Sequence, residues 1–245
     1  MDSKTIDQTT IYPLPNESDT SEKNKQNIKL KIADTIALKN EAYHLIYSKY
    51  REKGYIKKNI NKSWQTQYDK LKETTTFVAM DKDEVVGAVT IIFDSELNLP
   101  GDKLYREEIS KLRINNSLAE ISALGVKKDT RYSLTICVRL LNQAFLYAKG
   151  IKQTSHFIVT VNPRHTSFYL KAFLFYKLGE IKEYDKVGGA PAELLVLDLN
   201  HIEKILIERP PFHDKTMLKH CKSIKECKSK KEFKSSESQR WLRKN

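Results

Sequence analysis

Apolar and polar positions follow a helical spacing near the start of the chain. Over residues 34–53, apolar side chains such as Tyr43, Ile46 and Tyr50 recur at intervals of three or four positions, and Gly54 follows. This spacing predicts a helix over about 34–53 that ends at the glycine. The segments TTTFVAM and EVVGAVTIIF, rich in β-branched residues, flank Asp81-Lys82-Asp83 and predict a β-hairpin. GDKLYREEISKLR then predicts a short amphipathic helix.

Predicted strands and helices alternate in the second half of the chain. LAEISALGV (118–126), HFIVTV and AELLVLDL predict strands, and SLTICVRLLNQAFLYAKG and RHTSFYLKAF predict the helices between them. The longer helix is predicted to end at Gly150 and to have an apolar face formed by Leu134, Val138, Leu141 and Phe145. Alternation of this kind predicts an α/β domain with at least one βαβ crossover.

Composition divides the chain into three parts. Residues 1–27 are polar, with almost nothing to bury, and predict a disordered segment. Residues 28–207 are predicted to form the folded domain, and residues 208–245 a lysine-rich C-terminal tail. The whole chain has 245 residues, of which 40% are hydrophobic, which is enough for one domain with a proper core.

Positive charge points to an acidic partner. The formal net charge is +12, and residues 211–245 hold eleven Lys and Arg against four Asp and Glu, so the tail carries much of it. Such a balance suits nucleic acid, anionic lipid, an acidic protein or a phosphorylated cofactor, and the sign alone does not choose among them. Few aromatic residues interleave with the lysines of the tail, so base stacking on nucleic acid is not favoured.

Cysteine usage and hydropathy predict a soluble, cytoplasmic protein. The three cysteines are too few and too scattered for a disulfide framework. Cys221 and Cys227, with His220, do not have the spacing of a zinc site, so no metal is expected. The N-terminus lacks the features of a signal peptide, and no apolar stretch is long enough to span a membrane.

Glu120 is the first candidate for chemistry. It stands near the start of the predicted strand 118–126, between apolar neighbours, where a carboxylate could accept a proton or order a water. The alternative interpretation is a strand-edge glutamate paired with a lysine.

The segment KKDTRYSLT leads into the long predicted helix. Backbone N–H groups at its start, together with Lys127, Lys128 and Arg131, would suit a phosphate group. An ordinary helix start capped by Asp129 or Thr130 is equally consistent. No glycine lies between Val126 and Gly150, so there is no phosphate-binding loop of the nucleotide triphosphate type.

VNPRHTSFY contains three further polar candidates. Asn162 could hold an amide or cap a helix, Tyr169 could protonate a departing anion or fill the core, and His165 could be a base or purely structural. The residues themselves leave these alternatives open. No Ser-His-Asp or HExxH signature is present, which disfavours a hydrolase.

The order of these elements and the segment VNPRHTSFYLKAFLFYKLGE resemble the GCN5-related N-acetyltransferase (GNAT) superfamily. Asn162, Tyr169, Phe175 and Gly179 fall on its motif, while Leu174 replaces a usual glycine. The resemblance implies an α/β, GNAT-like acyltransferase fold: a central mixed, twisted sheet flanked by helices. It also implies that the acyl arm lies between two splayed parallel strands, at about 118–126 and 155–161.

A closer resemblance is to the long-chain N-acyl amino acid synthases of the FeeM type, which are related to acyl-homoserine-lactone synthases. Five segments in order, from EAYHLIYSKYREKGY to VGGAPAELLVLDL, carry it over about residues 40–200. The lactone synthases have arginines where this chain has Ile46, Thr90 and Ala123, so S-adenosylmethionine is not expected as the substrate. The acetyl-CoA enzymes carry a glycine loop where RYSLTI has none, which favours an acyl carrier protein as donor over CoA.

The resemblance implies an N-acyltransferase that joins a long-chain acyl group to the amine of an amino acid. No cofactor is expected to remain bound; the acyl-phosphopantetheine of an acidic acyl carrier protein, or an acyl-CoA, is the expected co-substrate. Whether the predicted tail contacts the carrier protein or an anionic membrane stays open at this point. Two alternatives stay open: an acetyl-CoA-dependent acetyltransferase, and a non-catalytic module that binds acyl groups or nucleic acid.

Site residues follow from the same resemblance and from the chemistry of amide formation. Glu120 is the predicted base and Tyr169 the predicted acid for the leaving thiolate, with main-chain N–H groups after Glu120 as oxyanion donors. The predicted substrate-binding residues are Asp69, Ser122, Asn162 and His165. The predicted donor-binding residues are Leu124, Val126, Lys127, Lys128, Arg131 and Arg139. Cys137 is expected to be a small core residue without a catalytic part.

Overall fold

A computed structural model describes residues 28–128 and 132–208 of the chain. The predictions for residues 1–27 and 209–245 therefore lie outside the described residues, as does Arg131. The described elements are β1 (Ile28–Ile32), α1 (Ile36–Glu52), η1 (Gln67–Lys70), β2 (Thr74–Asp81), β3 (Glu84–Phe93), α2 (Asp102–Arg113), β4 (Leu118–Val126), α3 (Ser133–Gly150), β5 (His156–Val161), α4 (Pro163–Phe173), β6 (Tyr176–Lys177), β7 (Lys182–Tyr184), η2 (Asp185–Val187), β8 (Ala190–Asp198) and α5 (Leu199–Glu208).

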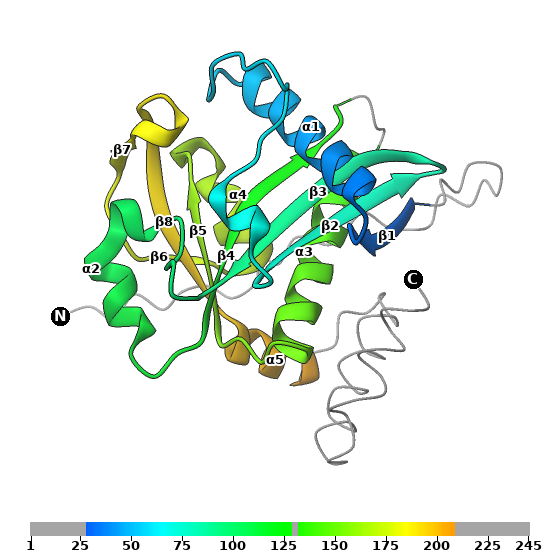
Figure 1. Cartoon of the computed structure of the whole chain (residues 1–245). Coiled ribbons are helices and arrows are strands. Elements are labelled where there is room, and N and C mark those ends of the chain that lie inside the picture. Colours follow the sequence, from blue (N-terminus) through cyan, green and yellow to red (C-terminus); the bar gives the residue numbers. More distant parts are fainter. Residues whose placement is uncertain (1–27, 129–131, 209–245) are drawn as a thin grey trace.

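One mixed sheet organises these elements (Figure 1). The strand order is β1-β2-β3-β4-β5-β8-β6, and β7 pairs with β8 as well. Neighbouring strands are antiparallel throughout, except that β4 and β5 run parallel. The helix α3 connects this parallel pair, as the predicted βαβ crossover requires. The expected α/β fold with a central mixed sheet is confirmed.

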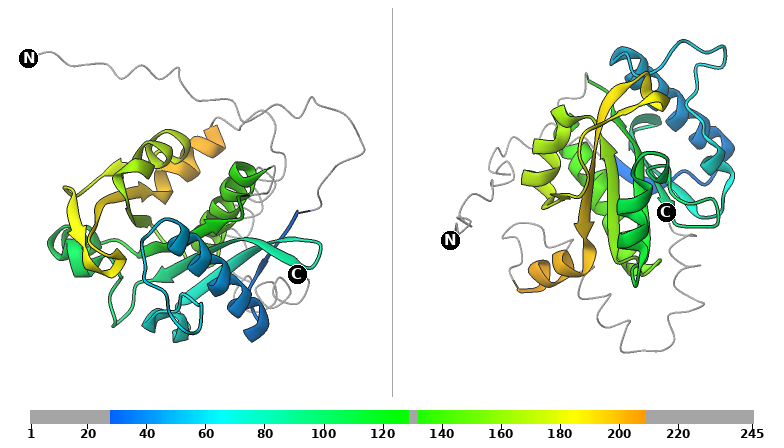
Figure 2. Two further views of the ribbon diagram at one scale, coloured as in Figure 1. Left: turned by 90° about the horizontal axis from the view of Figure 1, so that it is seen from above. Right: turned by 90° about the vertical axis from the view of Figure 1, so that its left-hand side faces the viewer.

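Helices cover both faces of the sheet, with α1 and α3 on opposite sides of it (Figure 2). One apolar cluster lies under α3 and α4 and includes Phe77, Phe145 and Phe157. On the other face, α1 packs over a second cluster, and α2 with η1 packs over a third. Because every central strand is buried on both faces, the sheet is the rigid base on which loops and helix ends are placed.

The predicted apolar face of α3 is partly wrong. Leu134 is 59% exposed, whereas Ile136 and Leu140 are buried against the sheet together with Ala144. A Cβ on Gly87 of β3 would lie 2.8 Å from Cγ2 of Ile136 and 3.0 Å from Cδ1 of Leu140. This close approach selects the face that carries Ile136 and Leu140, and it turns Leu134 outward.

Most predicted elements are present at nearly the expected positions. The helix over 34–53 is α1, and Gly54 follows its C-cap with a φ of +73°, a backbone conformation that glycine adopts without strain. The hairpin is β2–β3, and the alternating second half is β4 to β8. The short strand β1 and the helix α5 were not predicted. The last strand ends at Asp198, one residue earlier than expected, because Leu199 begins α5.

A partly buried ion network fixes α2 and the loop before it. The Arg113 guanidinium donates to Asp94 (Nε–Oδ2 2.5 Å) and to Asp102 (Nη2–Oδ2 2.7 Å). The Asp102 carboxylate also accepts the Leu99 N–H at 2.8 Å, and both carboxylates raise the pKa of Arg113. The network therefore joins both ends of α2 to the segment that follows β3.

Replacement of Arg113 by methionine should destabilise the protein by about 1–3 kcal/mol, the range for lost hydrogen bonds to charged groups. Urea unfolding followed by circular dichroism measures this difference. Arg106→Met is the matched control, because Arg106 is exposed on the same helix. Equal stability of the two variants would show that the network does not hold α2.

Candidate active site

The parallel strands β4 and β5 separate after a short stretch of pairing. Their register joins residues 118–120 to residues 156–158 and goes no further. A cavity of about 470 Å³ lies where they diverge, and residues 121–126 of β4, 159–161 of β5 and Asn162 at the start of α4 line it. The two predicted strands therefore splay apart around a cavity, and the binding of an acyl chain there stays a prediction.

A β-bulge marks the same place on the other edge of β4. Thr90 pairs with Ala123 and Ile91 pairs with Ile121, so Ser122 is an extra residue opposite β3. A bulge interrupts the hydrogen-bonding ladder and turns nearby backbone groups out of line. Ser122 also lines the cavity, so the strand segment predicted to supply oxyanion donors is irregular beside the gap.

Glu120 is the last residue of β4 that pairs with β5, and its side chain is buried, with 3% exposed. The Gly101 N–H, at the start of α2, donates to Glu120 Oε2 at 2.7 Å. Because β4 lies between β3 and β5, Glu120 is not at an edge of the sheet. Glu120 lines the cavity on the face that α2 covers, so its carboxylate borders the cavity rather than bulk solvent.

Aromatic residues form the cavity wall near Glu120. Tyr50 contacts Tyr55 and Trp64, with ring centroids 5.9 and 5.1 Å apart, and Tyr184 lines the cavity as well. Burial, followed by the nearby charge of Glu120 among other contributions, raises the pKa of Tyr184, and burial also raises that of Tyr50. Sequence reasoning missed these residues, since an aromatic at a helix end looks the same whether it faces a core or a cavity.

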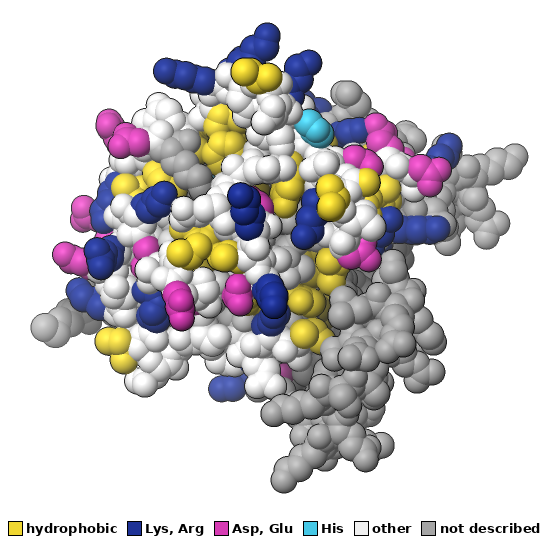
Figure 3. Space-filling model, in the orientation of Figure 1, with side chains coloured by type: hydrophobic (Ala, Val, Ile, Leu, Met, Phe, Trp, Pro, Cys, Tyr) yellow, Lys and Arg dark blue, Asp and Glu magenta, His cyan; other side chains and the backbone are white. Residues whose placement is uncertain are grey.

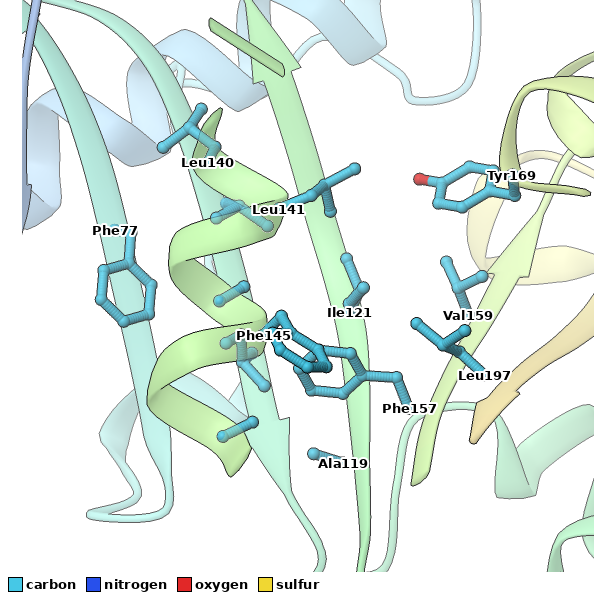
Figure 4. Close-up of a cluster of buried hydrophobic side chains, with 14 of the residues drawn as sticks. Phe77, Ala119, Ile121, Leu140, Leu141, Phe145, Phe157, Val159, Tyr169 and Leu197 are labelled. Atoms are coloured by element: carbon cyan, nitrogen blue, oxygen red, sulfur yellow. The ribbon is translucent and has the colours of Figure 1, made fainter. Parts of the chain in front are cut away.

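Tyr169 lines the cavity from the opposite face, on α4. Its ring is buried and packs edge-on against Phe168 and Phe175. Figure 4 shows its oxygen pointing away from α4 towards β4, across the space between the strands. Burial raises the pKa of Tyr169, with a smaller effect of Cys137, so the phenol keeps its proton at neutral pH. The position and protonation suit the predicted donor role, which stays a prediction.

A buried hydrogen bond holds α4, and with it Tyr169, against the sheet. Thr166 donates to the Glu193 carboxylate of β8 at 2.6 Å, and Lys177 pairs with the same carboxylate at 2.7 Å. Both partners lower the pKa of Glu193, although burial acts in the opposite direction. The carboxylate therefore stays ionised and fixed between helix and sheet.

The start of α4 contains the other polar candidates of VNPRHTSFY. Asn162 Oδ1 accepts the Arg164 N–H at 3.2 Å, so Asn162 caps the helix, and Pro163 occupies its first turn. His165 lines the cavity and accepts from Arg164 Nε at 3.2 Å when its Nε2 is unprotonated. Burial, and next the Arg164 charge, lower the pKa of His165. Arg164 also stacks on Tyr55 at 4.9 Å, so it joins α4 to the loop after α1.

Besides Glu120, three further predicted residues of β4 line the cavity: Ser122, Leu124 and Val126. Asp69 is not among the lining residues; its Oδ2 accepts from the Thr66 N–H and hydroxyl in a capping box at η1. Its predicted role in substrate binding has no support from this position and remains a prediction.

The predicted donor-binding cations lie at different places. Lys127 pairs with Glu84, and Lys128 pairs with Glu52 at the end of α1, both beside the C-terminal end of β4. Arg139 faces the other way along α3, where its guanidinium donates to the Ile28 carbonyl at 3.1 Å. Lys127 and Lys128 follow directly after Val126, the last residue of β4, which lines the cavity.

Charge on the surface is mixed. Figure 3 shows Asp and Glu among Lys and Arg over most of one face, with blue side chains gathered at the top. Within residues 28–128 and 132–208, no cluster of three or more His, Cys, Asp or Glu side chains is arranged to bind a metal. None of the helices in those ranges has the length and apolar character that a membrane crossing needs.

Comparison with models of protein families assigns this chain to one of them. The model of the family described as N-acyl amino acid synthase FeeM matches residues 41–198. The chain belongs to this family. The match covers both strands of the gap, Glu120 and Tyr169, and it makes the protein an acyltransferase. Among curated proteins, no sequence matches the chain.

Solved structures show the same fold. FeeM itself, an N-acyl amino acid synthase from uncultured soil microbes, aligns with a TM-score of 0.65 at 20% identity, over 75% of this chain and 98% of FeeM. The acyl-homoserine-lactone synthase LasI aligns with a TM-score of 0.54 at 15% identity, over 71% of this chain and 91% of LasI. The CoA-dependent lactone synthase BjaI gives 0.53 at 13% identity, over 74% and 88% of the two chains. The GNAT-like fold that the sequence predicts is confirmed.

Cys137 also lines the cavity, on α3, although it was expected to be only a small core residue. Burial raises the pKa of its thiol to about 12. In a Cys221→Ser/Cys227→Ser variant, iodoacetamide at pH 8.5 should label Cys137 more than about 1,000-fold more slowly than a free thiol, because little thiolate is present. Mass spectrometry against time measures the rate. Labelling at the rate of free cysteine would mean that the thiol is not shielded.

Proposed function

We propose that this acyltransferase joins a long-chain acyl group, carried as a thioester, to the α-amine of an amino acid. The observation that supports it most is the cavity between β4 and β5, with Glu120 on one face of the sheet and Tyr169 on the other. The reaction needs a base for the amine and an acid for the thiolate, and Glu120 and Tyr169 on opposite sides of the cavity would serve as this pair.

Glu120 would first accept a proton from the ammonium group, whose reference pKa is about 8. The freed lone pair attacks the thioester carbonyl carbon, and the oxyanion is held by main-chain N–H groups at the Ser122 bulge. When the C–S bond breaks, Tyr169 gives the thiolate a proton. Two protons leave the nitrogen in total: one reaches solvent through Glu120, and the other restores the Tyr169 phenol.

The donor half of the cavity suits an acyl chain. Its wall beyond the paired stretch is mainly apolar, including Leu124, Val126, Leu134, Val159 and Phe168. Holding the thioester beside the amine in such a site would supply much of the rate enhancement. We propose an acyl carrier protein as the donor, with acyl-CoA as the alternative, because the segment RYSLTI lacks the glycine loop of acetyl-CoA enzymes.

An acidic carrier would meet cations at the end of β4, where Lys127 and Lys128 lie. Cytoplasmic location follows from this proposal, because carrier-bound acyl groups are made there. Contact of residues 208–245 with an anionic membrane is a further proposal that the net charge of this segment supports. Nucleic acid is not proposed as a partner.

Glu120→Gln and Tyr169→Phe test the chemistry. Loss of the base should lower kcat/KM for the acceptor by about 100- to 10,000-fold, and loss of the acid by about 10- to 100-fold, as typical for general acid–base catalysis. Thiol release from an acyl carrier donor measures the rate, and lipid mass spectrometry of expressing cells identifies the N-acyl amino acid.

The controls are Glu203→Gln, which changes an ion-paired glutamate of α5 outside the cavity, and Tyr176→Phe, which changes an exposed tyrosine of β6. Both should retain the activity of any folded fraction. If cells with the wild type accumulate no acylated amine, or if Glu120→Gln is as active as the wild type, the proposal is wrong.

Donor choice is tested by charge reversal. Lys127→Glu/Lys128→Glu should raise KM for an acyl carrier donor by about tenfold or more at low salt, because steering by opposite charge is lost. The effect should shrink at high salt. Activity with a small acyl-pantetheine should stay unchanged, as should the activity of the control Lys103→Glu/Lys111→Glu, which reverses two exposed charges of α2. Faster turnover of acetyl-CoA than of any long-chain donor would favour an acetyltransferase.

A further inference from the structure

Thr160 lines the cavity on the same side as Glu120, and its hydroxyl is buried without a hydrogen-bond partner. Within the described residues, four buried side-chain oxygens have no hydrogen-bond partner in the protein: those of Ser63, Ser95, Thr154 and Thr160. Thr160 alone among these four lines the cavity. A buried hydroxyl that makes no hydrogen bond is costly, so its retention at a ligand site indicates a ligand that satisfies it.

The backbone brings this hydroxyl close to Glu120. Ile158 of β5 is the register partner of Glu120, and Thr160 follows two residues later, so both side chains emerge on the same face of the sheet. A Cβ placed on Gly101 would lie 3.1 Å from Thr160 Oγ1 and 3.2 Å from Glu120 Oε2. The hydroxyl and the carboxylate therefore border one small space at the start of α2.

Pairing on the other edge of β5 keeps Thr160 in place. Thr160 pairs with Leu194 of β8 in an antiparallel register, although β4 no longer pairs with β5 at this level. The strand backbone is thus fixed on one side and open to the cavity on the other. A side chain held in this way is suited to orient a ligand with little loss of conformational entropy on binding.

We propose that Thr160 is an amine-positioning residue of the acyl-transfer reaction. Its Oγ1 accepts one N–H of the acceptor amine while Glu120 takes the proton that must leave before attack. Once Glu120 has passed that proton to solvent, rotation about the Cα–N bond lets the amine donate its two N–H groups to Thr160 Oγ1 and to Glu120. The lone pair then points away from both acceptors, towards the thioester carbonyl carbon in the gap. This inference rests on the proposed N-acyltransferase function and adds to it the residue that orients the nucleophile.

Thr160→Val separates this role from a structural one. Valine keeps the shape and removes an unsatisfied hydroxyl, so the melting temperature should stay equal or rise. The value of kcat/KM for the acceptor amino acid should nevertheless fall by about 10- to 100-fold, the factor that corresponds to one hydrogen bond to a charged group. Thr160→Ser keeps the hydroxyl and should retain activity within about threefold of the wild type.

Thr154→Val is the matched control, since Thr154 carries another unpartnered buried hydroxyl but does not line the cavity. It should match Thr160→Val in thermal stability and the wild type in activity. Suppose that the wild type is active. If kcat/KM of Thr160→Val is then within twofold of the wild-type value, or if this variant is less stable, the inference about Thr160 is wrong but the proposed function is not. A wild type that consumes no thioester with any amino acid overturns the proposed function and this inference together.

Discussion

The separation of β4 from β5 after three residues of pairing is the constraint on which the site depends. Each strand still has a full partner on its other edge, because β3 pairs with β4 and β8 pairs with β5. The sheet therefore keeps its integrity while two inner strand edges face a cavity rather than each other. Unpaired backbone groups inside a protein need partners. The phosphopantetheine arm of the proposed thioester donor, which contains amide groups, would supply them.

Two ionic anchors, one on each face, place the two candidate catalytic groups. On one face, Arg113 holds the loop and helix start that bring the Gly101 N–H to Glu120. On the other, Glu193 joins Thr166 to the sheet three residues before Tyr169 on α4. Partly buried, hydrogen-bonded ion pairs position better than exposed ones, since few other arrangements satisfy them. The sheet thus sets how far apart Glu120 and Tyr169 lie across the gap. An anchor on each face sets how each of the two side chains is oriented.

The sequence predicted the fold well because periodicity reports local structure directly. The pairs β2–β3 and β4–β5 and the helices α1 and α4 follow from patterns of apolar residues. The short strand β1 carries too few residues for such a pattern, and the buried face of α3 depends on the glycine at position 87 of a strand distant in the sequence.

For the site, Glu120 and Tyr169 were found through motifs, whereas the aromatic wall and Thr160 were missed. The sequence around Tyr50, Trp64 and Thr160 does not tell whether these residues face a cavity or a core. Only the fold, which places them beside Glu120, shows that they line the cavity.

The electrostatics of the cavity favour an amine over other nucleophiles. No lysine or arginine is among the described residues that line it, and Glu120 is the one carboxylate there. Tyr50, Tyr169 and Tyr184 all have raised pKa values and keep their protons, and the lowered pKa of His165 keeps it neutral. Under the proposed function, a cationic ammonium group would therefore be drawn to Glu120, with no competing positive charge in the described wall. The same carboxylate that attracts the ammonium is the group placed to remove its proton, so binding and activation of the acceptor would depend on one charge.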